Sequence, residues 1–263
     1  MEIATIIGLI MAFLSVGVGM VLKGASLSSL NNSAALLIII GGTIATVCIG
    51  FPMEEIKKIP KLFRIIFLKD TYYTKLEVIS MFAEWVTISR REGLLSLENR
   101  ADEIEDAFLK EGMQMVIDGN DPEFIETVLM NSISQMEERH RNGALIFSQS
   151  GTYAPTLGVL GAVVGLVAAL SNLNQVDILG QMISAAFIAT LLGIFTGYVL
   201  WHPIANKLRQ KSKKEAEIKR MIVEGLLSLQ AGESVTANKQ KLMTYLSTVE
   251  RRRLEEERGE KAS

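Results

Sequence analysis

The side chains that most often carry out chemistry in proteins are few in this sequence and lie far apart. There are two histidines, His140 and His202, and a single cysteine, Cys48. One cysteine cannot build a disulfide framework, and two distant histidines do not make a metal-ligand cluster. The sequence also lacks the GxxxxGK[ST] loop that binds nucleotide phosphates. We therefore expect no enzyme activity, no metal and no cofactor.

Four long stretches of the chain contain no Asp, Glu, Lys, Arg or His. They are Ile3–Leu22, Ala34–Phe51, a stretch with its apolar centre at Tyr153–Leu170, and Ile178–Trp201. Proton relays and ion sites inside membranes normally use such side chains. Either this chain moves no ions, or another subunit supplies the carboxylate.

The third and fourth stretches instead contain small and hydroxyl residues. The glycines are Gly158, Gly161 and Gly165 in the third and Gly193 and Gly197 in the fourth. GxxxG spacing lets membrane helices approach closely, which predicts a packed interface or a pore lining. The hydroxyls include Thr156 and Thr190. A hydroxyl in lipid needs a hydrogen-bond partner, which its own helix backbone can also provide.

Two prolines, Pro155 and Pro203, lie at one end of these same two stretches. Proline removes a backbone donor and bends or ends a helix. Each is therefore interpreted either as the mark of a helix end or as a hinge between a membrane helix and the helix next to it.

The elements that must position these residues follow from the hydropathy of the chain. Of its 263 residues 49% are hydrophobic and 21% are charged, and the two kinds are segregated. A helix crosses a bilayer with about 20 apolar residues. We predict an all-α fold, a polytopic membrane protein with four transmembrane helices and a helical cytoplasmic domain. The net charge of −2 does not indicate nucleic-acid binding.

Basic residues predict which segments are cytoplasmic. Of the 27 Lys and Arg residues, 12 lie in Pro52–Arg141 and 14 in Lys207–Lys261, which leaves only Lys23 elsewhere. Because cytoplasmic segments collect Lys and Arg, both segments and both termini are expected inside the cell. The predicted organisation is transmembrane helices 1 and 2 (1–51), a cytoplasmic helical domain (52–146), transmembrane helices 3 and 4 (147–203) and a cytoplasmic helical tail (204–263).

The cytoplasmic segments are expected to be helical. Apolar residues recur every three or four positions over Lys75–Arg91, and the pair Asn120-Asp121 before Pro122 is typical of a helix start. That second helix is expected to reach about Arg141 and could continue into the third span. A further helix is expected over Asn206–Glu224. The charged tail beyond position 250 is typical of a frayed helix or of disorder.

Three segments of the chain resemble one known family. They are Ser89–Glu98 (SRREGLLSLE), Tyr153–Gly165 (YAPTLG and the glycines that follow), and Ala189–Ser212 (ATLLGI, then Pro203 and LRQKS). Together with four spans and a large segment between the second and third, they resemble the A subunit of the bacterial flagellar stator, the MotA/PomA family. Each motif is modest alone, and their ordered set is specific.

The resemblance implies an ion-driven machine with defined partners. Members of the family form a homo-oligomeric ring in the cytoplasmic (inner) membrane. The ring surrounds a MotB-like B subunit that has one membrane span and carries the ion-binding aspartate. Ion flow drives torque on a FliG-like protein of the rotor switch complex. The B-subunit aspartate agrees with the missing carboxylate noted above.

The resemblance also implies roles for single residues. Arg90 and Glu98 are similar to the charges that contact the rotor, with Arg91 as an alternative to Arg90. Pro155 and Pro203 are similar to the prolines that couple ion binding to cytoplasmic movement.

Three further positions are expected to line the ion path. Thr190 is similar to a polar pore position near the partner aspartate, and Thr156 is a second hydroxyl candidate. Sodium-type relatives tend to carry a hydroxyl residue where this chain has Ala162. The apolar alanine favours protons as the transported ion.

Two alternative functions remain open at this stage. The related ExbB/TolQ group of proton-driven energy transducers typically has three spans, and the four spans predicted here argue against it. A non-conducting membrane scaffold would use the glycines only for packing. It would show no ion-coupled phenotype.

Overall fold

The structure is a computed structural model that describes residues 3–68, 73–171 and 176–252. Within those ranges every regular element is a helix, and four helical stretches are long and apolar enough to cross a membrane. These stretches are Ile3–Leu22, Leu27–Gly50, Pro122–Leu170 and Ile178–Gln230. The predicted all-α fold with four membrane-spanning helices is confirmed. The charged tail from 253 onward lies outside the described residues.

The chain packs into two compact units, each built from two parts of the sequence. The membrane unit comprises Met1–Lys69 and Arg139–Gln210, and the polar unit comprises Asp70–Glu138 and Lys211–Ser263. These units are defined by packing, whereas the segments expected from the sequence are defined by membrane topology. Two long helices, α9 (Pro122–Leu170) and α11 (His202–Gln230), contribute residues to both units.

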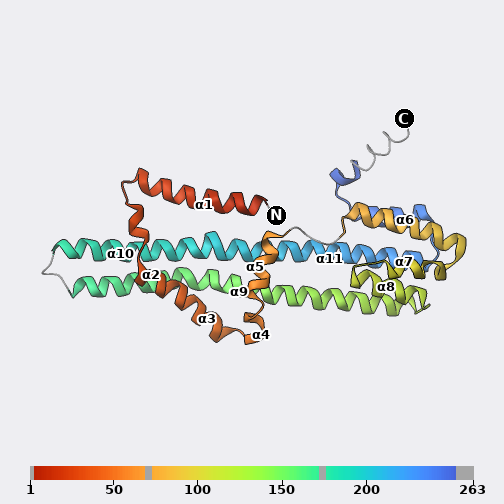
Figure 1. Cartoon of the computed structure of the whole chain (residues 1–263), viewed down its shortest axis with the longest axis horizontal. Coiled ribbons are helices and arrows are strands. Elements are labelled where there is room, and N and C mark those ends of the chain that lie inside the picture. Colours follow the sequence, from red (N-terminus) through yellow and green to blue (C-terminus); the bar gives the residue numbers. More distant parts are fainter. Residues whose placement is uncertain (1–2, 69–72, 172–175, 253–263) are drawn as a thin grey trace. The chain divides into compact units, whose positions relative to one another are not determined.

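The membrane unit contains the four spans. The first is α1 (Ile3–Leu22), the second runs through η1 (Leu27–Leu30), α2 (Ser33–Leu36), η2 (Leu37–Gly41) and α3 (Gly42–Gly50), the third is the end of α9, and the fourth is α10 (Val176–Phe195) with η4 (Thr196–Trp201). Two of these elements, η2 and η4, are π-helical turns, which are often found at functional sites. α10 lies alongside the end of α9 (Figure 1).

Two short helices follow the second span. They are α4 (Met53–Ile56) and α5 (Ile59–Phe67). α5 is amphipathic, and it packs its apolar side against α9 and α11, where Ile66 joins Phe147 and Leu208 in a small core. In Figure 1 α5 runs across these two helices and not along them.

The polar unit has the larger core. Its helices are α6 (Lys75–Glu92), η3 (Leu94–Leu97), α7 (Glu98–Asp102), α8 (Ala107–Ile117), the start of α9, the end of α11 and α12 (Val235–Met243). Thr74 and Glu77 form a reciprocal capping box that starts α6, and the Asp106 side chain caps α8. The helices expected over 75–91 and from Pro122 are present, and α9 continues into the third span. The tail helix is longer than expected.

The prolines do not mark helix ends. Pro155 lies inside the 49-residue helix α9, and Pro203 is the second residue of α11, which follows η4 without a break. The helix-end interpretation is therefore wrong for both residues. A proline inside a helix cannot bond to the carbonyl four residues earlier and clashes with it. The π-helical turn η4 ends at Trp201, two residues before Pro203, and provides a wider helical turn just ahead of it.

Candidate functional site

The third and fourth spans touch through their backbones at two glycines. A methyl group built on Gly193 would lie 2.7 Å from the Cα of Gly158 and 2.8 Å from the carbonyl oxygen of Ala154. A methyl group on Gly158 would lie 2.9 Å from the Cα of Gly193 and from the Ala189 oxygen. The atoms met are backbone atoms, which cannot rotate away as a side chain can. Each residue therefore has room for hydrogen alone.

Further glycines extend this contact in both directions. A methyl group on Gly161 would lie 3.3 Å from the Cβ of Ala189, and one on Gly165 would lie 3.2 Å from the Cβ of Ala186. Near the other end, Gly197 faces the Pro155 ring, where a methyl group would lie 2.7 Å from the ring carbons. The Pro155 ring thus lies in the space that the missing side chain of Gly197 leaves.

Pro203 has a different setting. It is exposed and lies next to His202. The His202 ring lies over Gly151, where a methyl group built on the glycine would be 2.8 Å from the ring carbons. The His202 ring also lies 5.3 Å from that of Tyr198. The residue beside Pro203, and not Pro203 itself, therefore packs closely against α9.

The three expected ion-path residues do not line a common groove. Thr190 is half-buried in an apolar groove of about 590 Å³, beside Val16 of α1 and Phe187, and neither Thr156 nor Ala162 lines that groove. The Thr156 hydroxyl donates to the Tyr153 carbonyl at 2.7 Å, so its own helix satisfies it. Within the described ranges, the Thr190 hydroxyl makes no such bond.

The two expected rotor-contact charges lie on either side of one turn in the polar unit. Arg90 is exposed in the last turn of α6, and Glu98 is exposed at the first residue of α7. Gly93 ends α6 with φ of +86°, a conformation that favours glycine. In the part of the chain that the structure describes, neither Arg90 nor Arg91 nor Glu98 forms an ion pair. These charges are therefore available to another molecule.

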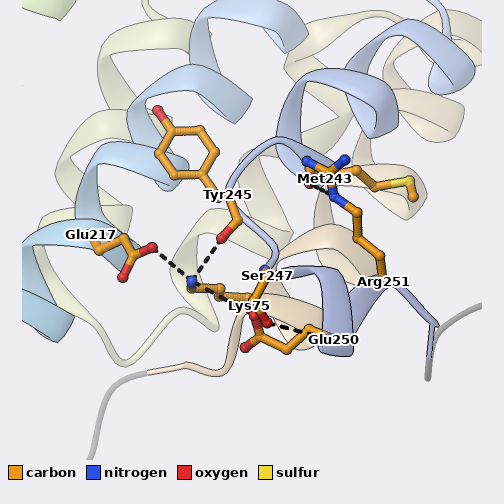
Figure 2. Close-up of polar contacts among 7 residues, drawn as sticks. All are labelled: Lys75, Glu217, Met243, Tyr245, Ser247, Glu250 and Arg251. Atoms are coloured by element: carbon orange, nitrogen blue, oxygen red, sulfur yellow. Dashed lines mark hydrogen bonds and ion pairs between the residues drawn. The ribbon is translucent and has the colours of Figure 1, made fainter.

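Sequence reasoning did not find a polar cluster around Lys75, shown in Figure 2. The ammonium of this mostly buried lysine donates to the Glu217 carboxylate and to the Tyr245 carbonyl, both at 2.7 Å, and lies 4.0 Å from Glu250. The Arg251 guanidinium donates to the Met243 carbonyl at 3.0 Å. The cluster ties the start of α6 to α11 and to the chain after α12. Its partners lie 142 and 170 positions from Lys75, beyond the reach of any local sequence signal.

A second polar cluster lies where α11 turns into α12. The Lys241 ammonium at 2.8 Å and the Ser228 hydroxyl at 2.7 Å both donate to Glu233. The hydrogen bond from Lys241, followed by that from Ser228, lowers the pKa of Glu233. The hydrogen bond to Glu233 also raises the pKa of Lys241, although partial burial opposes this shift.

Glu233 is expected to make the polar unit more stable at neutral than at acid pH. Because its pKa is lower in the fold, its contribution is present above pH 4.5, the ordinary pKa, and is lost as the pH falls through the lower folded value. Glu233→Gln should cost about 1 kcal/mol or less at pH 7, and the difference from wild type should shrink toward pH 3. Urea unfolding of the full chain in detergent, followed by Trp85 fluorescence, measures the loss of unfolding free energy at pH 7 and at pH 3. Glu126→Gln, at an exposed position, is the control. An equal effect of the two variants would contradict the stabilising role of Glu233.

No group of three His, Cys, Asp or Glu side chains in the described ranges could hold a metal ion. The membrane unit thus offers apolar walls, hydroxyls and backbone contacts, and the polar unit offers exposed charges. Such an arrangement can pack, tilt and bind a partner, and the uncharged stretches Ile3–Leu22, Ala34–Phe51, Tyr153–Leu170 and Ile178–Trp201 contain no carboxylate to take up an ion. These features define a subunit of a multi-pass membrane assembly.

Comparisons with known proteins place the chain within this class. Residues 100–221 match the sequence model of the MotA/TolQ/ExbB proton channel family, and residues 6–93 match that of the motility protein A N-terminal region. The chain is 53% identical to motility protein A of Bacillus subtilis (strain 168) over 98% of its own length and 95% of that protein. It is 31% identical to the chemotaxis protein PomA of Vibrio alginolyticus, over 94% and 96% of the two chains.

Solved structures agree with the sequence matches. The flagellar MotAB stator complex from Bacillus subtilis contains a chain that matches with a TM-score of 0.91 and 54% identity, over 95% of this chain and 98% of that one. A chain of C. jejuni MotAB matches with a TM-score of 0.89 and 31% identity, over 94% of this chain and 97% of that one. The chain belongs to the motility protein A family of flagellar stator subunits. This confirms the resemblance drawn from the sequence, and the family is one of ion channel and motility proteins, not of enzymes.

Proposed function

We propose that this chain forms an ion path with a one-span, MotB-like B subunit and converts ion flow into torque on a FliG-like rotor protein. The observation that carries the proposal is the match over nearly the whole chain, in sequence and in fold, to stator subunits. The chain is not expected to act alone, because its four uncharged stretches, Ile3–Leu22, Ala34–Phe51, Tyr153–Leu170 and Ile178–Trp201, contain no Asp, Glu, Lys, Arg or His.

The missing carboxylate defines what the B subunit must supply. A charged aspartate within an apolar collar is costly, and protonation relieves that cost. One elementary charge that crosses 100 mV releases roughly 2.3 kcal/mol, which is enough to drive a step between two packings of the collar. The apolar Ala162, where the sodium-type relatives tend to carry a hydroxyl, favours protons over sodium. Thr190, whose hydroxyl has no hydrogen-bond partner among the residues that the structure describes, is the candidate contact to the aspartate.

The proposed orientation puts both termini in the cytoplasm of an inner-membrane protein. The support is the concentration of Lys and Arg in the segment after the second span and in the tail. The polar unit, with Arg90 and Glu98 exposed, then faces the rotor.

Pro155 and Pro203 are the proposed joints. Both lie inside continuous helical stretches whose helices, α9 and α11, contribute to both units. Because each lacks a backbone donor, the helix bends more easily there than elsewhere. The Pro155 ring packs closely against Gly197 of the fourth span. This contact supports a bend in α9 whose angle changes when the packing of the third and fourth spans changes.

The test uses cells that lack only this gene. We expect intact filaments that do not turn, with swimming restored by the wild-type gene. The double variant Arg90→Glu, Arg91→Glu should restore swimming poorly, because it reverses the exposed charge at the end of α6 without touching a packed contact. Lys110→Glu, another charge change on the polar unit, is the control.

Filament counts and swimming speeds separate the outcomes. Normal swimming of the deletion strain, in a cell without a second stator set, would contradict the stator role and favour an ExbB/TolQ-like transducer or a scaffold. Full rescue by the double variant would contradict the charge contact only.

A further inference from the structure

An apolar groove of about 170 Å³ lies in the membrane unit between the second span and α5. Its walls include Val47 and Cys48 of α3, Phe63 of α5, Phe147 of α9 and Trp201 of η4. A span, a short crossing helix and two later helices thus enclose one space. None of the residues discussed above for ion flow or rotor contact lines it.

The walls of the groove are firmly packed. The Phe63 ring meets that of Phe147 edge to face at 5.1 Å, and the Trp201 ring lies 6.2 Å from Phe63 and 6.3 Å from Phe147. Gly42, at the start of α3, packs closely against Leu157 of α9. A methyl group built on Gly42 would lie 3.0 Å from the Leu157 side chain. The aromatic cluster therefore gives one wall of the groove a fixed shape.

The two hydroxyl groups of the groove are not available to a polar ligand. Its two hydroxyls donate to their own helices, that of Thr43 to Ile39 at 2.6 Å and that of Ser150 to Ile146 at 2.9 Å. Apart from the Cys48 thiol and the Trp201 indole N–H, the remaining lining is apolar. An apolar cavity of roughly 150 Å³ holds a group the size of benzene. The groove is suited to a stretch of one hydrocarbon chain.

Basic side chains accompany the apolar residues of α4 and α5. Lys57, Lys61 and Arg64 are exposed and form no ion pair within the described ranges, whereas Lys58 pairs with Glu55 at 2.5 Å. In α5 the basic positions 61 and 64 lie on the side of the helix opposite the buried Ile66, a pattern typical of helices at the membrane surface. Cationic side chains next to an apolar groove match a ligand with a hydrocarbon chain and an anionic head.

We propose that this groove binds one acyl chain of an anionic phospholipid, with its phosphate held by Lys57, Lys61 and Arg64. Ile44 on the groove and Ile49 beside it are 58% and 86% exposed in the single chain and lie on a membrane span, so the opening is accessible to a lipid at this surface of the chain. The lipid would brace the second span against α9 at the point where α3 ends. This proposal concerns a binding site and does not depend on the ion or on the rotor contact.

The chain carries its own reporter for this lipid. Trp201 lines the groove, whereas Trp85 is only 6% exposed in the core of the polar unit. The full-length chain is reconstituted in vesicles whose phosphatidylcholine or phosphatidylglycerol has brominated acyl chains, which quench nearby tryptophan. We expect the affinity of the site for phosphatidylglycerol to be at least about five times its affinity for phosphatidylcholine. One basic residue near an anionic membrane surface raises the binding affinity about fivefold.

Two variants and a control separate the parts of the proposal. Replacing Lys57, Lys61 and Arg64 together by glutamine should bring the ratio of the two lipids near one. Cys48→Phe should fill the groove and reduce quenching by both lipids, whereas Ile49→Phe, one position further and pointing outward, should leave quenching unchanged.

Three results would overturn the proposal. Equal competition by the two lipids in the wild-type chain would show no preference for an anionic head. Unchanged quenching in Cys48→Phe would show that no chain enters the groove. No quenching of Trp201 by either lipid would show that protein, such as a second copy of the chain, covers the groove. The first result needs no variant to fold.

Discussion

Gly193→Val is expected to leave cells without motility because the third and fourth spans can no longer pack. The new side chain would begin 2.7 Å from the Cα of Gly158 and 2.8 Å from the Ala154 oxygen, both backbone atoms. Overpacking of a side-chain core costs about 1–3 kcal/mol, and a backbone that cannot yield should cost at least as much. We expect the variant to be found in the membrane at reduced level, with swimming lost. Immunoblots of membrane fractions measure the level of the variant in the membrane, and swimming assays measure motility.

Gly180→Val is the matched control on the same helix. A methyl group on Gly180 meets nothing within 4 Å, and the residue is exposed, so the same substitution adds bulk without a clash. It should leave both membrane level and swimming near wild type. Equal losses in the two variants would show that valine acts through helix propensity, and equal retention would show that the spans separate at Gly193 in the working stator.

The membrane unit illustrates what hydropathy and spacing could predict. The four spans were visible as uncharged stretches, and the glycines of the third and fourth spans were visible as GxxxG spacings. Which glycine meets which could not be predicted, because the rotation and depth of one helix against another are not written in either segment alone. The pairing of Gly197 with the Pro155 ring is an example.

The polar unit shows the limits of periodicity. On the helix expected over 75–91 the structure buries Val78 completely, whereas Leu76, two positions before it, is only half-buried. α6 packs on several helices, so its buried face is wider than a single stripe. The ammonium of Lys75 is a charge on the same helix that long-range partners bury, and no short-range pattern indicates them. The π-helical turns likewise have no local sequence signal that we could identify.

Phe82→Ala is expected to cause the largest loss of stability in the polar unit. The ring is fully buried and packs edge to face against Trp85, with the ring centroids 5.1 Å apart. It also lies on Gly225 of α11, where a methyl group built on the glycine would be 2.7 Å from the Phe82 ring. Gly225 has no side chain that could fill the space left by the ring. Removal of a buried phenylalanine ring costs about 3–5 kcal/mol when the surroundings cannot collapse. Thermal unfolding of the full chain in detergent, followed by Trp85 fluorescence, should show a Tm lower by at least about 6 °C.

Phe124→Ala provides the comparison at an exposed position of the same unit. Phe124 is 53% exposed in the first turn of α9, so its truncation should change stability by about 0.5 kcal/mol or less. A small effect of Phe82→Ala, similar to that of Phe124→Ala, would mean that α6 does not pack on α11 as described. Because Phe82 joins α6 to α11, that result would also remove the fixed base from which the end of α6 presents Arg90, and with it the physical basis of the proposed rotor contact.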